Sequence, residues 1–201
     1  MHTMTFAELD DWVAQQSPLI QTHAFFDAAE HFDDEGVQFH RGDLVVDSLV
    51  VSPVTVIDGN AVTSEIAYDY DVGLLVVTGN LTCDHIGRLA FDVVVGGSLY
   101  AKTICANTLN SYGLYVGGDI RCDVFAEFGC YTEVQGKIHC ARVLSLMNDV
   151  VAKGGIDGAL FQLRGTDVAQ LLIPDVLTED GYFDEEKFSA YVREARSPFK
   201  T

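Results

Sequence analysis

Two stretches in the middle of the chain decide its fold: VVVGGSLYAKTI, residues 93–104, and LYVGGDIRCDVF, residues 114–125. Aligned on their paired glycines, both carry an apolar residue two positions before the second glycine, and two, four and seven positions after it. Apolar side chains two positions apart lie on the same face of a β-strand. Each stretch therefore predicts a strand, a glycine turn and a second strand.

The same unit recurs on both sides of these stretches, with successive glycine spacings of 17, 20, 18, 21, 18 and 18 residues. Its copies are GDLVVDSL from Gly42, GNAVTSEI from Gly59, GNLTCDHI from Gly79, GSLYAKTI from Gly97, GDIRCDVF from Gly118, GKIHCARV from Gly136 and a weaker GGIDGALF from Gly154. One such coil cannot bury its apolar face alone, whereas stacked coils share a narrow core. The repeat therefore predicts a mainly β fold, a parallel β-helix of about six to seven coils. The strict six-residue rhythm of left-handed β-helices is missing, which favours a right-handed helix.

Four positions of the unit are expected to face the core: the third, the fifth, the eighth and the one two places before the glycine. The third position holds Leu44, Ala61, Leu81, Leu99, Ile120, Ile138 and Ile156. The eighth position holds Leu49, Ile66, Ile86, Ile104, Phe125, Val143 and Phe161. The position after each glycine is often Asp, Asn or Ser, residues that suit a tight turn.

Three cysteines, Cys83, Cys122 and Cys140, share the fifth position of the unit. An inward row needs small side chains there, and free cysteine is a small residue that is often buried. None of the three forms a CxxC pair, so core packing is favoured over the alternative of a metal or redox site. His139 is expected to face the opposite side of its strand from Cys140.

The flanks predict a three-part organisation: a helical N-terminal cap at residues 1–36, the solenoid at 37–163, and a helical C-terminal cap and tail at 164–201. Thr5 and Glu8 have capping-box spacing at the start of a predicted helix over 5–16. Further helices are predicted over 22–32, from Thr166 through Ile173, and from Asp184 through about Arg196. Helices over both ends would cover open strand edges, which predicts a monomer or small homo-oligomer.

The formal net charge is −18, from 30 acidic and 12 basic residues. Such a charge disfavours nucleic acid and anionic membranes and favours a basic protein partner, although acidity can also serve solubility alone. No stretch is long and apolar enough to cross a bilayer, and the first residues lack the pattern of a secretory signal. Five cysteines, an odd number, suit a reducing environment. A soluble, cytoplasmic protein is expected.

GDLVVDSL, residues 42–49, and VGGDIRCD, residues 116–123, resemble the repeat of bactofilins, the polymer-forming cytoskeletal proteins. The resemblance covers roughly residues 37–161. It implies a right-handed β-helix and, in bacteria, filaments joined head-to-head or tail-to-tail. Bactofilin ends are usually disordered, whereas the flanks of this chain are predicted to be ordered helices. Capped acidic solenoids also resemble proteins found beside bacterial toxins, which implies an immunity role.

One surface is a candidate partner-binding site, because tyrosine carries binding energy and acidic groups steer a basic partner. It is centred on the corner after the second coil and extends over aromatic residues near later corners. Its residues are Tyr68, Asp69, Tyr70, Asp71, Tyr112, Tyr115, Phe128 and Tyr131. The alternative is that these rings pack against the flanking helices.

No serine or cysteine lies in a recognisable nucleophile motif, and the paired glycines lack the GK[ST] element of a phosphate loop. His85 alone fits the place of the histidine that acyltransferases with left-handed β-helices carry between coils. We expect no catalytic residue, cofactor or metal. The leading hypothesis is a non-catalytic protein-binding solenoid, an immunity or antitoxin protein that occludes a basic toxin domain. The alternative is a bactofilin-like, polymer-forming cytoskeletal scaffold.

Overall fold

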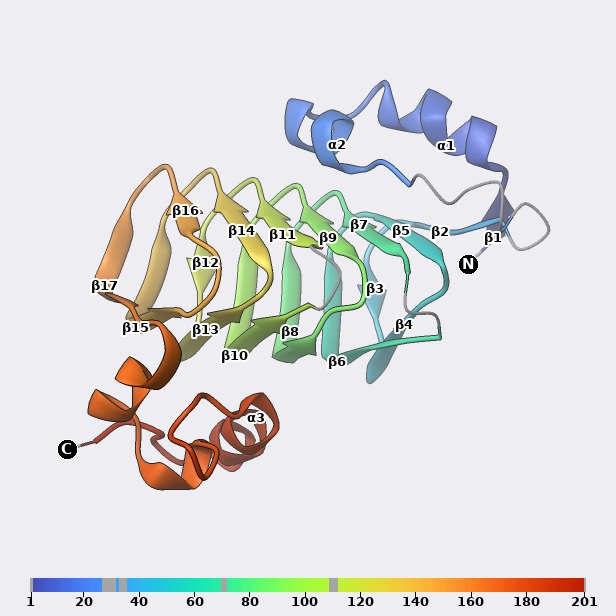
Figure 1. Cartoon of the computed structure of the whole chain (residues 1–201). Helices are drawn as coiled ribbons and strands as arrows, with labels where there is room; N and C mark the ends of the chain where they lie inside the picture. Colours follow the sequence, from blue (N-terminus) through green and yellow to red (C-terminus); the bar gives the residue numbers. More distant parts are fainter. Residues whose placement is uncertain (1, 27–31, 33–35, 70–71, 109–111, 201) are drawn as a thin grey trace.

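The computed structural model describes residues 2–26, 32, 36–69, 72–108 and 112–200. The middle of the chain is a β-solenoid of about seven turns, in which each turn contributes strands to two facing sheets (Figure 1). The predicted fold class is therefore confirmed. Because the turns follow one another in chain order, position in the sequence corresponds to position along the solenoid axis.

The first sheet has the order β1-β2-β5-β7-β9-β11-β14-β16. Its strands are β1 (His2–Met4), β2 (Val37–Arg41), β5 (Val54–Asp58), β7 (Leu74–Val77), β9 (Asp92–Val95), β11 (Gly113–Val116), β14 (Tyr131–Val134) and β16 (Val150–Ala152). Neighbouring strands pair in parallel, apart from β1, which pairs antiparallel with β2. The N-terminal edge of this sheet is thus covered by the chain's own first strand.

The second sheet is built from the longer strands of each turn and closes the solenoid on its other side. Its strands are β3 (Leu44–Val45), β4 (Ser48–Val51), β6 (Ala61–Tyr68), β8 (Leu81–Arg88), β10 (Leu99–Asn107), β12 (Ile120–Arg121), β13 (Val124–Phe128), β15 (Ile138–Ser145) and β17 (Ile156–Gln162). In the described part of the chain β17 pairs only with β15, so the last turn leaves a strand edge open.

Strand register confirms the third-position row that the repeat predicted. Each member pairs with its counterpart in the next turn, through Leu44, Ala61, Leu81, Leu99, Ile120, Ile138 and Ile156. The four from Leu81 to Ile138 have no exposed surface. Parallel pairing of equivalent positions therefore builds one continuous apolar core between the two sheets.

The residues of the eighth-position row face the core as predicted, except in the last turn, where the prediction for Phe161 is wrong. Val143 pairs with Leu160, while Phe161 pairs with Leu144 and packs in a second apolar cluster outside the solenoid. The register shifts between His139 and Arg142, opposite Gly158. Gly158 has a positive φ of 149°, and a Cβ there would collide with a backbone carbonyl of the preceding turn.

The residues after the corner glycines form a polar ladder along the solenoid. The side-chain oxygen of each accepts a hydrogen bond from the backbone amide of its counterpart in the next turn. The bonds run from Asn60 to Asp43 (2.8 Å), Asn80 to Asn60 (2.8 Å), Ser98 to Asn80 (2.8 Å), Asp119 to Ser98 (3.1 Å) and Lys137 to Asp119 (2.9 Å). The preference for Asp, Asn and Ser thus has a second cause beyond turn formation, because these side chains join successive turns.

Replacing Asn80 with alanine is expected to lower the free energy of unfolding by about 1 kcal/mol, since one amide loses its acceptor at an exposed corner. Urea unfolding at neutral pH measures the change. Lys137→Ala is the matched control, because Lys137 occupies the same corner position but is the last donor of the ladder. Equal losses in both variants would show that the ladder does not stabilise the fold.

The N-terminal flank begins as the sequence predicted. Helix α1 (Phe6–Val13) carries a complete capping box, in which the Thr5 hydroxyl accepts from the Glu8 amide and the Glu8 carboxylate accepts from the Thr5 amide at 2.8 Å. The second helix was predicted over 22–32, but α2 spans Pro18–His23 and residues 24–26 are not helical, which is a correction to its start; residues 27–31 of the prediction lie outside the described residues. Pro18 lies at the first position of this helix, where proline is tolerated because its missing N–H would have no partner within the helix.

The C-terminal flank contains two 3₁₀ helices, η2 (Gly165–Gln170) and η3 (Pro174–Val176), and helix α3 (Glu185–Arg193). The predicted helix from Thr166 is therefore a shorter 3₁₀ segment. Asp184 caps α3 as predicted, because its side chain accepts from the Lys187 amide.

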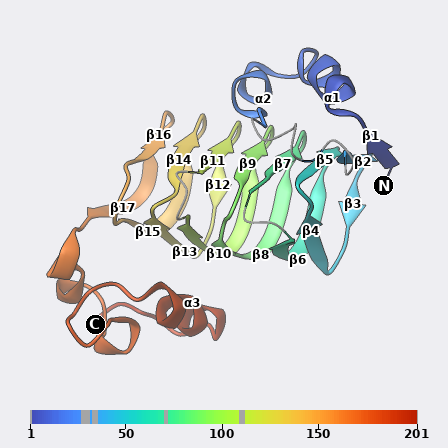
Figure 2. The ribbon, with the colours of Figure 1, turned by 45° about the vertical axis from the view of Figure 1, so that its right-hand side comes forward.

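The sequence predicted that the helices of the flanks lie over the ends of the solenoid. Only β1 covers an end, at the edge of the first sheet, and the helices lie along the sides. Helices α1 and α2 cover the outer face of the first sheet, where Leu9 and Ile20 are buried against strand residues (Figure 2). The C-terminal flank lies against the outer face of the second sheet, where Phe188 and Val192 join Cys105, Ala126 and Leu144 in one apolar cluster. The outer faces of both sheets are apolar in these places, and covering them outweighs covering the ends.

Candidate functional site

The predicted aromatic surface is divided in the structure. Tyr68 is half-buried and meets Phe91 edge-on, with ring centroids 5.7 Å apart. Asp69 is exposed and accepts a hydrogen bond from the Ser52 hydroxyl at 2.5 Å. Tyr70 and Asp71, the other two residues predicted at this corner, lie outside the described residues.

Two of the remaining rings pack against the flanks, which was the alternative interpretation. Tyr115 stacks on His23 of α2 with centroids 3.8 Å apart, and Phe128 contacts Phe183 of the C-terminal flank at 5.1 Å. Burial raises the pKa of Tyr115 to about 12 and lowers the pKa of His23 below its ordinary value. These two rings therefore hold the flanks in place.

Tyr112 and Tyr131 complete the predicted set. Tyr131 is 38% exposed, and its ring lies 6.1 Å from that of Tyr115 on the outer face of the first sheet. Tyr112 is half-buried at the preceding corner. The structure thus brings Tyr115 and Tyr131 together, while Phe128 is directed toward the opposite flank.

Charge is distributed unevenly along the solenoid axis. Residues 1–87 contain 15 acidic residues but only one Lys or Arg, Arg41. Residues 88–201 contain 15 acidic and 11 basic residues. The first turns of the solenoid, over the described residues 36–69 and 72–87, hold six acidic residues and one Lys or Arg, so this end of the solenoid is acidic. Counting charges by repeat, rather than over the whole chain, could have revealed this from the sequence.

An exposed apolar surface lies at this acidic end, on the outer side of the second sheet. Val45 and Val62, called here the valine surface, are 76% and 43% exposed and pair directly with each other, while Val50, 43% exposed, lies further along the same sheet and pairs with Ala67. Asp47 and Glu65 are exposed in the same two turns. Apolar residues beside acidic ones are the anatomy of a surface that binds a basic protein.

A cavity of about 660 Å³ lies between the outer face of the second sheet and the C-terminal flank. His85, the histidine singled out in the sequence, lines it, and its Nδ1 lies 2.9 Å from the Thr103 hydroxyl. Burial and the nearby Arg193 lower the pKa of His85, so the ring is neutral at neutral pH. The sequence could not reveal this cavity, because its strand residues, between His85 and Arg142, are 50 to 114 positions away from its flank residues, between Val192 and Phe199.

The cysteine row packs in the core and also makes hydrogen bonds. Cys83 and Cys140 are 1% and 3% exposed, and each thiol donates to the carbonyl two residues along the chain, at 3.3 and 3.2 Å. Thr63 makes the equivalent bond at 2.8 Å. Three members of the row thus combine a small side chain with a hydrogen bond to the backbone, which the argument from small size did not predict.

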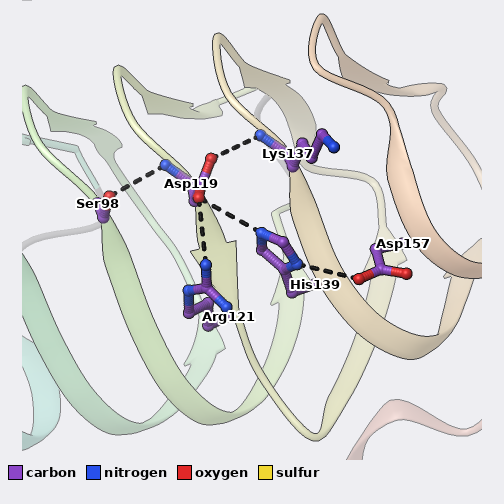
Figure 3. A network of polar contacts seen from close by, with 6 residues as sticks. All are labelled: Ser98, Asp119, Arg121, Lys137, His139 and Asp157. Carbon is purple, nitrogen blue, oxygen red and sulfur yellow. Dashed lines mark hydrogen bonds and ion pairs between the residues drawn. The ribbon is translucent and has the colours of Figure 1, made fainter.

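A network of polar contacts ties the last three turns together on the outer side of the second sheet (Figure 3). The second carboxylate oxygen of Asp119 lies 3.4 Å from His139 Nε2 and 3.5 Å from Arg121, and His139 Nδ1 lies 3.2 Å from Asp157. The Lys137 amide and the His139 ring lower the pKa of Asp119. His139 thus faces outward while Cys140 faces the core, as predicted.

No group of three or more metal-ligating side chains occurs within the residues that the structure describes. Over the same residues, no helix is long and apolar enough to cross a membrane. Comparison with protein-family models, with curated proteins and with solved structures finds no match for this chain.

Proposed function

We propose that this chain is a non-catalytic, cytoplasmic protein-binding solenoid, and that it acts as a bacterial immunity or antitoxin protein. Its acidic N-terminal end binds a basic toxin domain and occludes it. The observation that carries the proposal is the pairing of 15 acidic residues with a single arginine over residues 1–87, the part of the chain that bears the valine surface.

Both parts of this surface contribute to binding. The acidic charge steers a basic partner and raises the association rate, an effect that weakens as salt screens it. The exposed valines supply apolar area that a partner buries, which slows dissociation. Val45 is the first candidate for a strong contact, because it is 76% exposed at the end of the short strand β3.

The chemistry of three of the five thiols supports a non-catalytic role. Burial raises the pKa of Cys83 to about 11 and the pKa of Cys105 and Cys130 to about 12. The thiolate is the nucleophilic form of cysteine, so these three groups are protonated at neutral pH. They serve packing in the apolar clusters of the solenoid and its C-terminal flank.

The test is protection of cells against the toxin encoded beside this chain, together with binding of the purified toxin domain. We expect the double variant Asp47→Asn/Glu65→Gln to bind at least about tenfold more weakly at low salt, with the loss shrinking as salt rises. Adding Val45→Lys is expected to abolish protection. Glu179→Gln/Asp180→Asn removes the same charge from exposed positions of the C-terminal flank and is the matched control. Equal effects of the two double variants, or no protection by the unaltered chain, would contradict the proposal.

A second candidate function is a bactofilin-like scaffold, and the open last turn favours it. Strand β17 has a free edge in the described residues, with Leu160 40% exposed, and Val151 of β16 is 37% exposed. Open edges invite pairing with another chain. Electron microscopy of the purified protein distinguishes the two candidates: long unbranched filaments support the scaffold, and single short particles support the occluding protein.

A further inference from the structure

The cavity beside the C-terminal flank collects positive charge in a strongly acidic protein. Four of the chain's 12 basic residues line it: Lys102, Arg142, Arg193 and Arg196. Asp123 is the one acidic side chain of the lining. These residues come from strands of three successive turns and from the end of the chain, so only the docking of the flank brings them together.

Two of these charges are not neutralised by the protein. Lys102 pairs with Asp84 at 3.0 Å, and Arg196 pairs with Glu194 at 2.8 Å. Among the residues that the structure describes, the guanidinium groups of Arg142 and Arg193 take part in no ion pair or hydrogen bond. Arg142 instead lies over the ring of Phe199, 4.5 Å from its centroid, which orients its guanidinium group at the wall of the cavity.

The rest of the wall is mainly apolar, with a pair of polar side chains on the strand side. Val192, Pro198 and Phe199 of the flank face Val124 and Ala141 of the second sheet across the cavity. His85 and Thr103 form a hydrogen-bonded pair on β8 and β10. A volume of about 660 Å³ is that of a site for a small organic molecule.

We propose that this cavity binds a small organic anion, a carboxylate or phosphate head group on an apolar body. Arg142 and Arg193 hold the head group, since guanidinium groups form strong, charge-assisted hydrogen bonds with both kinds of anion. The apolar body lies between the flank and the sheet. The proposal is independent of the valine surface, because the strand residues that line the cavity begin at His85, whereas the valine surface lies on β3 and β6.

Anilinonaphthalene sulfonate, a fluorescent organic anion with an apolar body, is the probe. We expect one probe molecule to bind per chain and to be displaced by octanoate and by octyl phosphate, whose relative affinities identify the preferred head group. Octanol and inorganic phosphate are expected not to displace it at the same concentrations. Displacement by octanol as effective as by octanoate would overturn the role of the arginines, and displacement by inorganic phosphate alone would overturn the role of the apolar wall.

Variants locate the binding in this cavity. Arg142→Gln/Arg193→Gln is expected to weaken probe binding at least about tenfold, the loss typical of charge-assisted hydrogen bonds. Ala141→Phe fills the cavity without changing its charge and is expected to abolish binding. Arg41→Gln, at the other end of the solenoid, is the matched control. Circular dichroism establishes that each variant is folded, and unchanged affinity in both cavity variants would overturn the proposal.

Discussion

Replacing Phe125 with alanine is expected to lower the free energy of unfolding by about 4 kcal/mol, because truncating a buried aromatic ring leaves a cavity. Phe125 has no exposed surface and pairs with Ile104 in the preceding turn and Val143 in the next. Strand pairing holds these turns at a constant spacing, so neighbouring side chains cannot move in to fill the space. Urea unfolding at neutral pH, followed by circular dichroism, measures the loss.

Phe25→Ala is the matched control for this prediction. Phe25 is 71% exposed, so removing its ring is expected to change the free energy of unfolding by less than about 0.5 kcal/mol. A loss at Phe125 no larger than the loss at Phe25 would contradict the assignment of Phe125 to the stacked core.

Replacing Glu127 with alanine is expected to cost about 3 kcal/mol of stability, because it leaves buried backbone donors without an acceptor. Glu127 has no exposed surface, and its carboxylate accepts from the amides of Gly129 (2.6 Å), Leu146 (3.1 Å), Met147 (3.0 Å) and Asn148 (2.9 Å). Burial raises the pKa of Glu127, although the four amides act in the opposite direction. The side chain thus joins the corners of two successive turns, and urea unfolding at neutral pH measures its contribution.

Glu127→Gln separates hydrogen bonding from packing. Its shape is nearly the same, but one carboxylate oxygen becomes an amide nitrogen that faces a backbone donor, so an intermediate loss is expected. Glu65→Ala, at an exposed strand position, is the control and is expected to change stability by less than about 0.5 kcal/mol. Glu127→Ala as stable as the control would show that water replaces the carboxylate.

The core of this fold could be predicted because its signal is local and repeated. Leu81, Leu99 and Ile120 occupy one position of a repeating unit, and pairing places them directly above one another. The repeat failed only at Phe161, where a shift in register displaces the final strand. A local irregularity of this kind leaves no trace in a pattern of apolar residues.

The candidate sites could be predicted much less well. Tyr115 and Phe128 are aromatic residues near corners, and in the sequence they look alike. In the structure Tyr115 stacks on His23, whereas Phe128 packs at a tilt against Phe183 on the opposite side of the solenoid. Which ring remains free for a partner depends on where the flanks dock, and no spacing in the sequence reports that.

The sequence by itself determined the stacked turns, the inward rows and the acidic balance, because each is a property of a strand face or of composition. Tertiary structure alone decided that the flanks lie along the sheets and that Arg142 and Arg193 line one cavity. The physical reason is the separation along the sequence between the residues that come into contact. A period of about eighteen residues encodes contacts between neighbouring turns. The docking of a flank depends on which apolar faces remain uncovered after the solenoid has formed.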